Sequence, residues 1–457
     1  AYFLPTLPVA LGWILLLDPK FGLVNQSVMK LTGMQQPPFD IYSYWGIVWV
    51  HLMTHGIAIK VMLLTPAFRN LDAALEESSR VAGAGPLRTL RRIIVPIMMP
   101  AILVATILGL IRSLEAFEIE LILGVPIGLH VFSTKIYSFM TIEPPQFPPA
   151  TALGSLFLVI LLLLVALQRL CLRGRAFTTV TGRGFSTRPL PLGGWRIPIF
   201  LIVLTIAMTV TVVPTFFLIV GTFMKLFGYF NIASPWTLDN WRNVVQDPIL
   251  TRSFKNTIVL GLSTAAVGVL LSSLTAYIIA KSRYAGRAWL DLVSWIPWSI
   301  PGILLGMSLI WTFLLINKIV PFYGTMYALV VAMVISGLPL SVQVIKSFLV
   351  QLSDELEEAS RVAGASWFAT YRRILLPLLL PCLIVVGLLE FISAAHNIST
   401  VVLLATGQTR TLSLLMLDFT AGAELERATV VAVMIVMLVV AAGLVARGLG
   451  GRFGIRS

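Results

Sequence analysis

The 457-residue sequence has little charge and few residues that commonly bind metals. Charged residues make up 12% of it, against roughly 25% in an average soluble domain. Its only two cysteines, Cys171 and Cys382, fall at a helix end and within an apolar run, which excludes a disulfide framework or a cysteine metal knuckle. Two of its four histidines, His51 and His55, have helical i, i+4 spacing, but no third ligand stands near them in sequence. We therefore predict no metal site and no cofactor.

The sequence also lacks the motifs of several enzyme classes. No stretch matches the phosphate loop G-x4-G-K-[ST], so we expect no nucleotide site of the usual kind. No Ser/His, HExxH or paired-Asp arrangement stands at catalytic spacing, which argues against an intramembrane enzyme. The net charge of +13 does not indicate nucleic-acid binding, because the basic residues lie in short loops and form no basic helix.

Long apolar runs dominate what is present. The sequence is 58% hydrophobic, with a mean hydropathy of +0.93. A helix needs about 20 mostly apolar residues to cross a bilayer. Ten ranges are predicted as spans: 2–17, 44–66, 93–114, 151–171, 197–223, 256–280, 288–315, 325–350, 374–397 and 427–447. The sequence therefore predicts an all-α integral membrane protein, a polytopic helical bundle.

One segment occurs twice without a gap, 281 positions apart, at residues 76–100 and 357–381. This repeat divides the chain into a first half (1–171), a linker (172–196) and a second half (197–457). Alignment of the halves on the repeat places the run 2–17 opposite 288–315. Two further helices are then expected before Ala1, which would give two homologous halves of six spans each.

The basic residues predict the orientation of the spans. When the ten spans are threaded alternately, both copies of the repeat, the linker and the C-terminal tail fall on the side that is rich in Lys and Arg. That side is expected to be the cytoplasm. The linker is itself polybasic and lacks apolar periodicity, so it is expected to be flexible and able to contact anionic membrane lipid.

Each copy of the repeat predicts two short helices joined by a turn. Ala, Leu and Glu favour helix over 71–82 and 352–363, and a glycine then interrupts each helix where a tight turn is needed. A second short amphipathic stretch follows each glycine and leads into the next span. The repeat is expected to lie along the membrane surface and to present four glutamates to the cytoplasm: Glu76, Glu77, Glu357 and Glu358.

These residues resemble the E-A-A-x3-G-x9-I-x-L-P pattern of the permease subunits of binding-protein-dependent ABC importers. It appears as Glu77-Ser78-Ser79 with Gly83, Ile93, Val95 and Pro96, and again as Glu358-Ala359-Ser360 with Gly364, Ile374, Leu376 and Pro377. The departures are Ser for Ala and Val95 for Leu. The resemblance implies a translocation subunit of a bacterial-type inner membrane that works with a substrate-binding protein outside and two ATPase subunits inside.

The resemblance also implies roles for individual residues. Each copy would be a coupling helix that docks into a cleft on an ATPase subunit. The candidate coupling residues are Glu76, Glu77, Gly83, Glu357, Glu358 and Gly364.

The cargo is less well indicated. Residues 11–26 and 114–140 resemble fused-repeat permeases for ferric iron, while related permeases carry polyamines, thiamine or phosphonates. A secondary transporter driven by an ion gradient is the alternative class, since such proteins also contain repeats. That alternative does not explain why the best-matched repeat lies in a cytoplasmic loop.

Ionisable residues inside predicted spans are the candidates for a substrate pathway, because such groups are costly in a bilayer. The three candidates are Glu115, Glu390 and His396, near the outer ends of equivalent helices; Glu115 and His396 occupy matching positions. Three roles stay open for them: contact with a cationic cargo, docking of the binding protein, and a simple interfacial cap.

Overall fold

The computed structural model describes residues 4–57, 60–61, 64–65, 68, 71, 73–172 and 193–452. Apart from one antiparallel bridge between Met224 and Trp236, every regular element in these ranges is a helix. The predicted all-α polytopic fold is therefore confirmed. Most of the predicted linker, residues 173–192, lies outside the described part of the chain.

Six of the ten predicted spans contain a helix long and apolar enough to cross a membrane. These helices are α9 (Phe147–Leu172), α10 to α11 (Arg196–Thr222), α13 (Pro248–Lys281), α16 (Met326–Gln351), α18 to α19 (Trp367–His396) and α21 (Leu425–Arg452). A further expected span, 2–17, contains the shorter helix α1 (Thr6–Leu17). The run 44–66 begins with α3 (Tyr44–His51) and the π-helix η1 (Leu52–Gly56), and then includes residues outside the described ranges.

Two expected spans are bent instead of straight. Helix α14 (Arg287–Trp295) and η7 (Ile296–Ser299) meet α15 (Gly302–Ile316) at 111°, and the break contains Pro301. Proline there removes a backbone donor and favours an extended residue before it. The run 93–114 belongs to a second pair, which includes α7 (Val95–Leu114) and is bent by 65°.

Four ranges between the predicted spans also contain helices. The range 18–43 contains α2 (Leu23–Thr32), and 224–254 contains α12 (Asp239–Gln246). In 115–150, η3 (Glu120–Gly124) and η4 (Val125–Ile127) precede α8 (Phe132–Thr141), and the two arms of this pair are bent by 79°. In 398–424 the structure has α20 (Leu412–Ala421). None of these helices alone has the roughly 20 residues of a straight span. The bent pair over residues 120–141 is apolar enough to count as one broken span.

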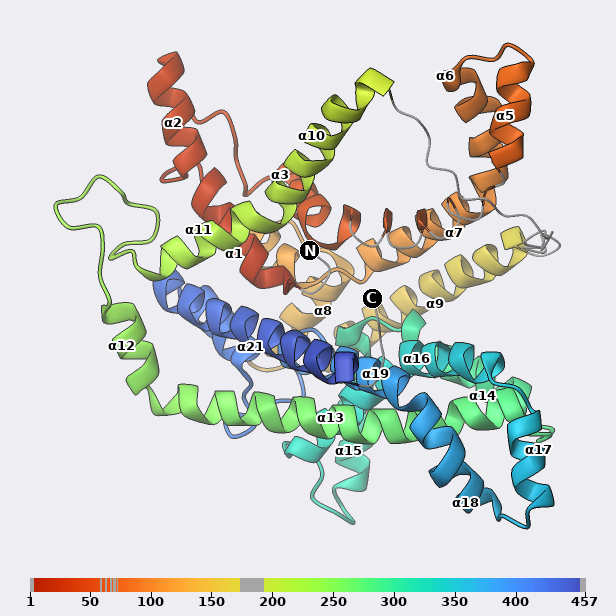
Figure 1. The fold of residues 1–457 in the computed structure, drawn as a ribbon. Coiled ribbons are helices and arrows are strands. Elements are labelled where there is room, and N and C mark those ends of the chain that lie inside the picture. Colours follow the sequence, from red (N-terminus) through yellow and green to blue (C-terminus); the bar gives the residue numbers. More distant parts are fainter. Residues whose placement is uncertain are drawn as a thin grey trace.

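The second half has its core where α13 packs along α16 and α19 (Leu376–His396). The halves are joined where α11 (Val213–Thr222) of the second half lies against α1 of the first (Figure 1). Gly12 makes this approach possible, because a Cβ at that position would lie 2.3 Å from the carbonyl oxygen of Pro214. Such close helix contacts through small residues are typical of membrane bundles.

Candidate functional site

The two copies of the repeat fold into matching helical hairpins. The first repeat segment consists of α5 (Ala73–Val81) and α6 (Pro86–Thr89), and the second of α17 (Glu355–Val362) and α18 (Trp367–Thr370). Each is followed by a π-helix, η2 (Leu90–Ile94) or η8 (Tyr371–Leu375), at the start of the next span. Both hairpins project from the right-hand end of the molecule in Figure 1. The helix–turn–helix prediction is confirmed for both copies.

Glycine makes the turn in each repeat segment. Gly83 has a φ of 77° and Gly364 a φ of 80°, in the left-handed region that residues with a Cβ rarely adopt. The next amide closes the turn: Ala84 N–H donates to Ser79 O at 3.0 Å, and Ala365 N–H to Ser360 O at 3.1 Å. A Cβ on either glycine would meet nothing within 4 Å. Backbone conformation, not space, therefore requires glycine here.

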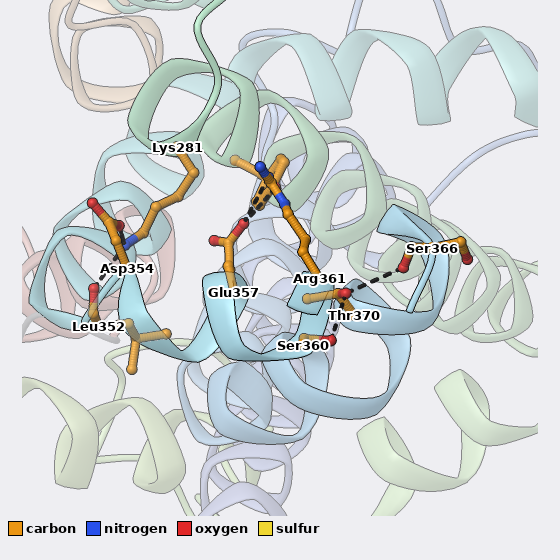
Figure 2. Close-up of polar contacts among 9 residues, drawn as sticks. Lys281, Leu352, Asp354, Glu357, Ser360, Arg361, Ser366 and Thr370 are labelled. Carbon is orange, nitrogen blue, oxygen red and sulfur yellow. Dashed lines mark hydrogen bonds and ion pairs between the residues drawn. The ribbon is translucent and has the colours of Figure 1, made fainter. Parts of the chain in front are cut away.

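A buried hydroxyl pair holds the two helices of each segment together. The Oγ of Ser79 lies 2.8 Å from Oγ1 of Thr89, and Oγ of Ser360 lies 2.8 Å from Oγ1 of Thr370. Figure 2 shows the second pair and the further bond from Thr370 to the carbonyl of Ser366. Because the same contacts occur in both copies, the segments are alike in internal structure as well as in sequence.

The glutamates of the second repeat segment differ in exposure. Glu358 is exposed, as expected, whereas Glu357 is only 6% exposed. One oxygen of Glu357 accepts a hydrogen bond from the Tyr277 hydroxyl at 2.9 Å and lies 3.7 Å from the Arg361 guanidinium. The prediction that Glu357 is presented to the cytoplasm is therefore wrong, because its carboxylate is buried and accepts a hydrogen bond from Tyr277 of α13. In the first segment Glu77 is exposed, and the side chain of Glu76 lies outside the described residues.

Exposed apolar side chains occupy matching positions on the two segments. Val81 and Val362 are each 90% exposed, Leu87 is 76% exposed, and its counterpart Phe368 is 62% exposed. Each valine lies two residues before the turn glycine. Sequence analysis emphasised the glutamates and missed this surface, although the shared Arg-Val-Ala-Gly string in both copies could have indicated it. We call Val81 with Leu87, and Val362 with Phe368, the two apolar tips.

A lysine fastens the beginning of the second segment. Lys281, at the end of α13, donates from Nζ to the carbonyl of Leu352 at 2.7 Å and pairs with the Asp354 carboxylate (Figure 2). The hydrogen bond and charge of Lys281 lower the pKa of Asp354 from its ordinary value of 3.8. The segment is thus attached to α13 at both Asp354 and Glu357.

The pathway candidates lie in different environments. Glu390 is 2% exposed, lies between α13, α16 and α19, and accepts a hydrogen bond from Ser341. Gly337 makes room for its carboxylate, since a Cβ there would lie 2.1 Å from Oε2. In this structure the Glu390 carboxylate is inaccessible to solvent, so a solute could reach it only if those helices separated. Glu115 pairs with Arg112 at 2.9 Å at the end of α7, and His396 is the half-buried last residue of α19.

One half-buried polar contact was not expected. His51 of α3 pairs through Nε2 with a carboxylate oxygen of Glu120, the first residue of η3. The partners are 69 positions apart, and sequence spacing had instead paired His51 with His55, whose side chain lies outside the described residues. Within the described part of the chain, no group of three or more His, Cys, Asp or Glu side chains is placed to hold a metal ion.

The fold and the paired segments define a polytopic membrane component with two repeated halves. The family of binding-protein-dependent transport system inner membrane components matches the chain over residues 1–175 and 268–454. Because these residues make up more than half of the sequence, the chain belongs to that family. Its membrane is accordingly the inner membrane of a bacterial-type cell.

Several curated proteins are similar to this chain. A ferric transport system permease protein (FbpB) of Actinobacillus pleuropneumoniae is 26% identical over 89% of this chain and 58% of its own length. A putative ferric transport system permease (FbpB 1) of Haemophilus influenzae is 26% identical over 89% of this chain and 63% of its own. The chain thus spans about six tenths of these relatives. A trehalose transport system permease (SugB) of Mycobacterium tuberculosis is 26% identical over 43% of this chain and 71% of its own length.

Proposed function

We propose that this chain is the membrane permease of an ATP-driven importer, and that each repeat segment docks one ATPase subunit. The observation that carries the proposal is the matched pair of apolar tips on two hairpins at one end of the molecule. A valine that is 90% exposed beside a rigid turn is well suited to fill a pocket on a partner. Two equivalent tips fit two copies of the same partner.

The charged residues would play a secondary part in docking. Glu77 and Glu358 are exposed beside the tips and would contact basic groups at the rim of the ATPase cleft. Rim charges chiefly affect partner choice and association rate, while buried apolar anchors supply most of the binding energy. The turn glycines Gly83 and Gly364 would fix the angle at which each tip is presented.

The energy for transport would come from the docked ATPase subunits, since no phosphate loop stands in the sequence. Closure of an ATPase pair would displace the two repeat segments and rock the halves between inward-facing and outward-facing states. A binding protein would deliver solute on the outer side. In this scheme the chain is a translocation subunit and not itself an enzyme.

Ferric iron is the cargo that we propose first. The names of the two relatives that cover 89% of the chain support it. The similarity to a trehalose permease over less than half of the chain indicates that this fold accepts other solutes. Polyamine, thiamine and phosphonate therefore remain the alternatives.

A transport assay separates these cargoes. Cells that carry the permease operon or its deletion would be tested for uptake of radiolabelled ferric iron, spermidine and thiamine, and for growth on a phosphonate. We expect uptake of iron alone to depend on the operon. If deletion of the operon abolished uptake of one of the other solutes and left iron uptake unchanged, that solute would replace iron as the cargo. The assignment to the class of importers would stand.

The docking proposal is tested by co-purification of the full-length permease with the ATPase encoded beside it. We expect Val81→Asp combined with Val362→Asp to abolish recovery of the ATPase, because an unpaired carboxylate would enter an apolar pocket. Ile319→Asp is the matched control, since Ile319 is 87% exposed. It lies between the predicted spans 288–315 and 325–350, where alternate threading places the chain on the side opposite the repeat segments. Recovery of equal ATPase from the double variant and the wild type would refute docking at the tips.

A further inference from the structure

The second repeat segment is attached to α13 by side chains from one face of that helix. Tyr277 and Lys281 are four residues apart, and residues at this spacing project from the same side of a helix. Tyr277 binds Glu357 within α17, and Lys281 binds the backbone and carboxylate just before α17. Helix α17 is therefore held to the end of α13 by contacts distant in sequence, in addition to its covalent connection to α18.

The Tyr277–Glu357 contact is the buried member of this attachment. Tyr277 is 5% exposed and Glu357 is 6% exposed, whereas Asp354 is exposed. The other oxygen of Glu357, Oε1, is buried and has no hydrogen-bond partner among the described residues. The Tyr277 hydroxyl donates a hydrogen bond to this carboxylate, and the Arg361 guanidinium lies 3.7 Å from the same oxygen. Hydrogen bonds to charged groups are stronger than neutral ones.

Helix α13 links this contact to the middle of the second half. Gly268 precedes Tyr277 by nine residues, or about 13 Å along a helix. A Cβ at Gly268 would lie 3.3 Å from the carboxyl carbon of Glu390, whose carboxylate is bonded to Ser341 of α16. A displacement of α13 at Tyr277 would therefore also displace Gly268 relative to Glu390 and Ser341, where α13, α16 and α19 pack together.

We propose that Glu357 is a positioning residue, which couples displacement of the second repeat segment to α13 through the Tyr277 hydroxyl. The bond makes α17 and the end of α13 one rigid unit. Movement of α17 by a docked ATPase subunit then moves α13 against α16 and α19. This proposal rests on the proposed function, because it requires the ATPase to dock on the segment.

The chain offers a matched control for this bond. Tyr371, the first residue of η8, is 8% exposed and donates from its hydroxyl to Ser273 Oγ of α13 at 3.0 Å. Tyr371→Phe removes a buried tyrosine hydroxyl bond to α13, as Tyr277→Phe does. Only Tyr277→Phe removes a contact to α17, because Tyr371 lies in η8, outside that helix.

The experiment uses the full-length permease, its ATPase and its binding protein reconstituted in proteoliposomes, with radiolabelled ferric iron as the probe. Three quantities are measured for each variant: ATPase recovered on purification, the rate of ATP hydrolysis, and iron transported per ATP hydrolysed. We expect Tyr277→Phe to retain the first two and to lower iron transported per ATP about tenfold. Tyr371→Phe should keep the wild-type ratio.

A second variant makes the test specific to the pair. Glu357→Gln should lower the ratio as Tyr277→Phe does, and the double variant should show little additional loss, since both changes remove one interaction. A wild-type ratio in Tyr277→Phe, or an equal loss in Tyr371→Phe, would overturn the role of Glu357 while docking stands. Failure of the wild type to recover the ATPase would instead remove the proposed function, and this role with it.

Discussion

The two repeat segments are nearly identical in structure, whereas the interiors of the two halves differ. Both segments have a glycine of φ near 80°, a hydroxyl pair at 2.8 Å and a valine that is 90% exposed. Inside the spans the buried carboxylate Glu390 stands where the first half has Gly109, and its donor Ser341 stands where the first half has Lys60. The pair of His51 and the buried Glu120 likewise corresponds to two apolar residues in the second half.

This difference separates two kinds of constraint. If both repeat segments dock copies of one partner, as proposed, they must keep the same shape, which accounts for their likeness. In the proposed function a solute would contact both halves together, so the two halves need not present the same groups to it. We therefore expect changes at equivalent positions to act equally in the repeat segments and unequally inside the spans.

The largest expected effect concerns the apolar tips taken singly. Val81→Asp and Val362→Asp should each weaken ATPase binding by at least about tenfold, and to a similar degree, because each places a carboxylate in a pocket built for an apolar side chain. Surface-immobilised permease titrated with purified ATPase would measure both affinities. A large loss in one variant and none in the other would break the equivalence of the segments.

The next effect is confined to the second half. Gly337→Ala should destabilise the protein by about 1–3 kcal/mol, because its methyl group would overlap the Glu390 carboxylate. Adding Glu390→Gly, the residue type at the matching position of the first half, should recover most of this loss. Thermal unfolding in detergent measures both. Gly443→Ala in α21, where a Cβ meets nothing within 4 Å, is the control. If the Gly337→Ala protein were as stable as this control, the Glu390 carboxylate would be able to move away from the added methyl group at no cost in stability, and the expected crowding would be absent.

A smaller and symmetric effect is expected at the turns. Gly83→Ala and Gly364→Ala should each cost about 1–2 kcal/mol, because both require a left-handed backbone and neither is crowded. Hydrogen exchange of each hairpin would show the loss as faster exchange confined to that segment. Unequal costs would mean that surroundings outside the hairpins, and not backbone strain, decide the result.

The smallest effect belongs to the second segment and depends on pH. The pKa of Asp354 is lowered by Lys281, so their contact contributes fully above the ordinary pKa of 3.8 and is lost as pH falls through the lowered value. Exchange of the turn before α17 should accelerate only below about pH 4. Asp354→Asn should exchange at one pH-corrected rate across this range. If Asp354→Asn showed the same acceleration of exchange below about pH 4, a titrating group other than Asp354 would be responsible for it.

Sequence reasoning recovered what depends on local pattern. Apolar runs of about 20 residues gave the long helices, and two glycines at matched spacing gave the hairpin turns. It failed where chain segments distant in sequence meet. The burial of Glu357 depends on Tyr277, 80 positions away, and the pair of His51 and Glu120 joins residues 69 positions apart.

The most direct test of the account is site-specific crosslinking in native membranes. A photoreactive amino acid would be placed at Val81, at Val362 and, as a control, at Ile319 of the full-length permease. We predict that Val81 and Val362 each give an adduct of one permease with one ATPase subunit, in similar yield, and that Ile319 gives none. Absence of an ATPase adduct at both valines, with the complex intact, would contradict the claim that two matched surfaces dock the ATPase.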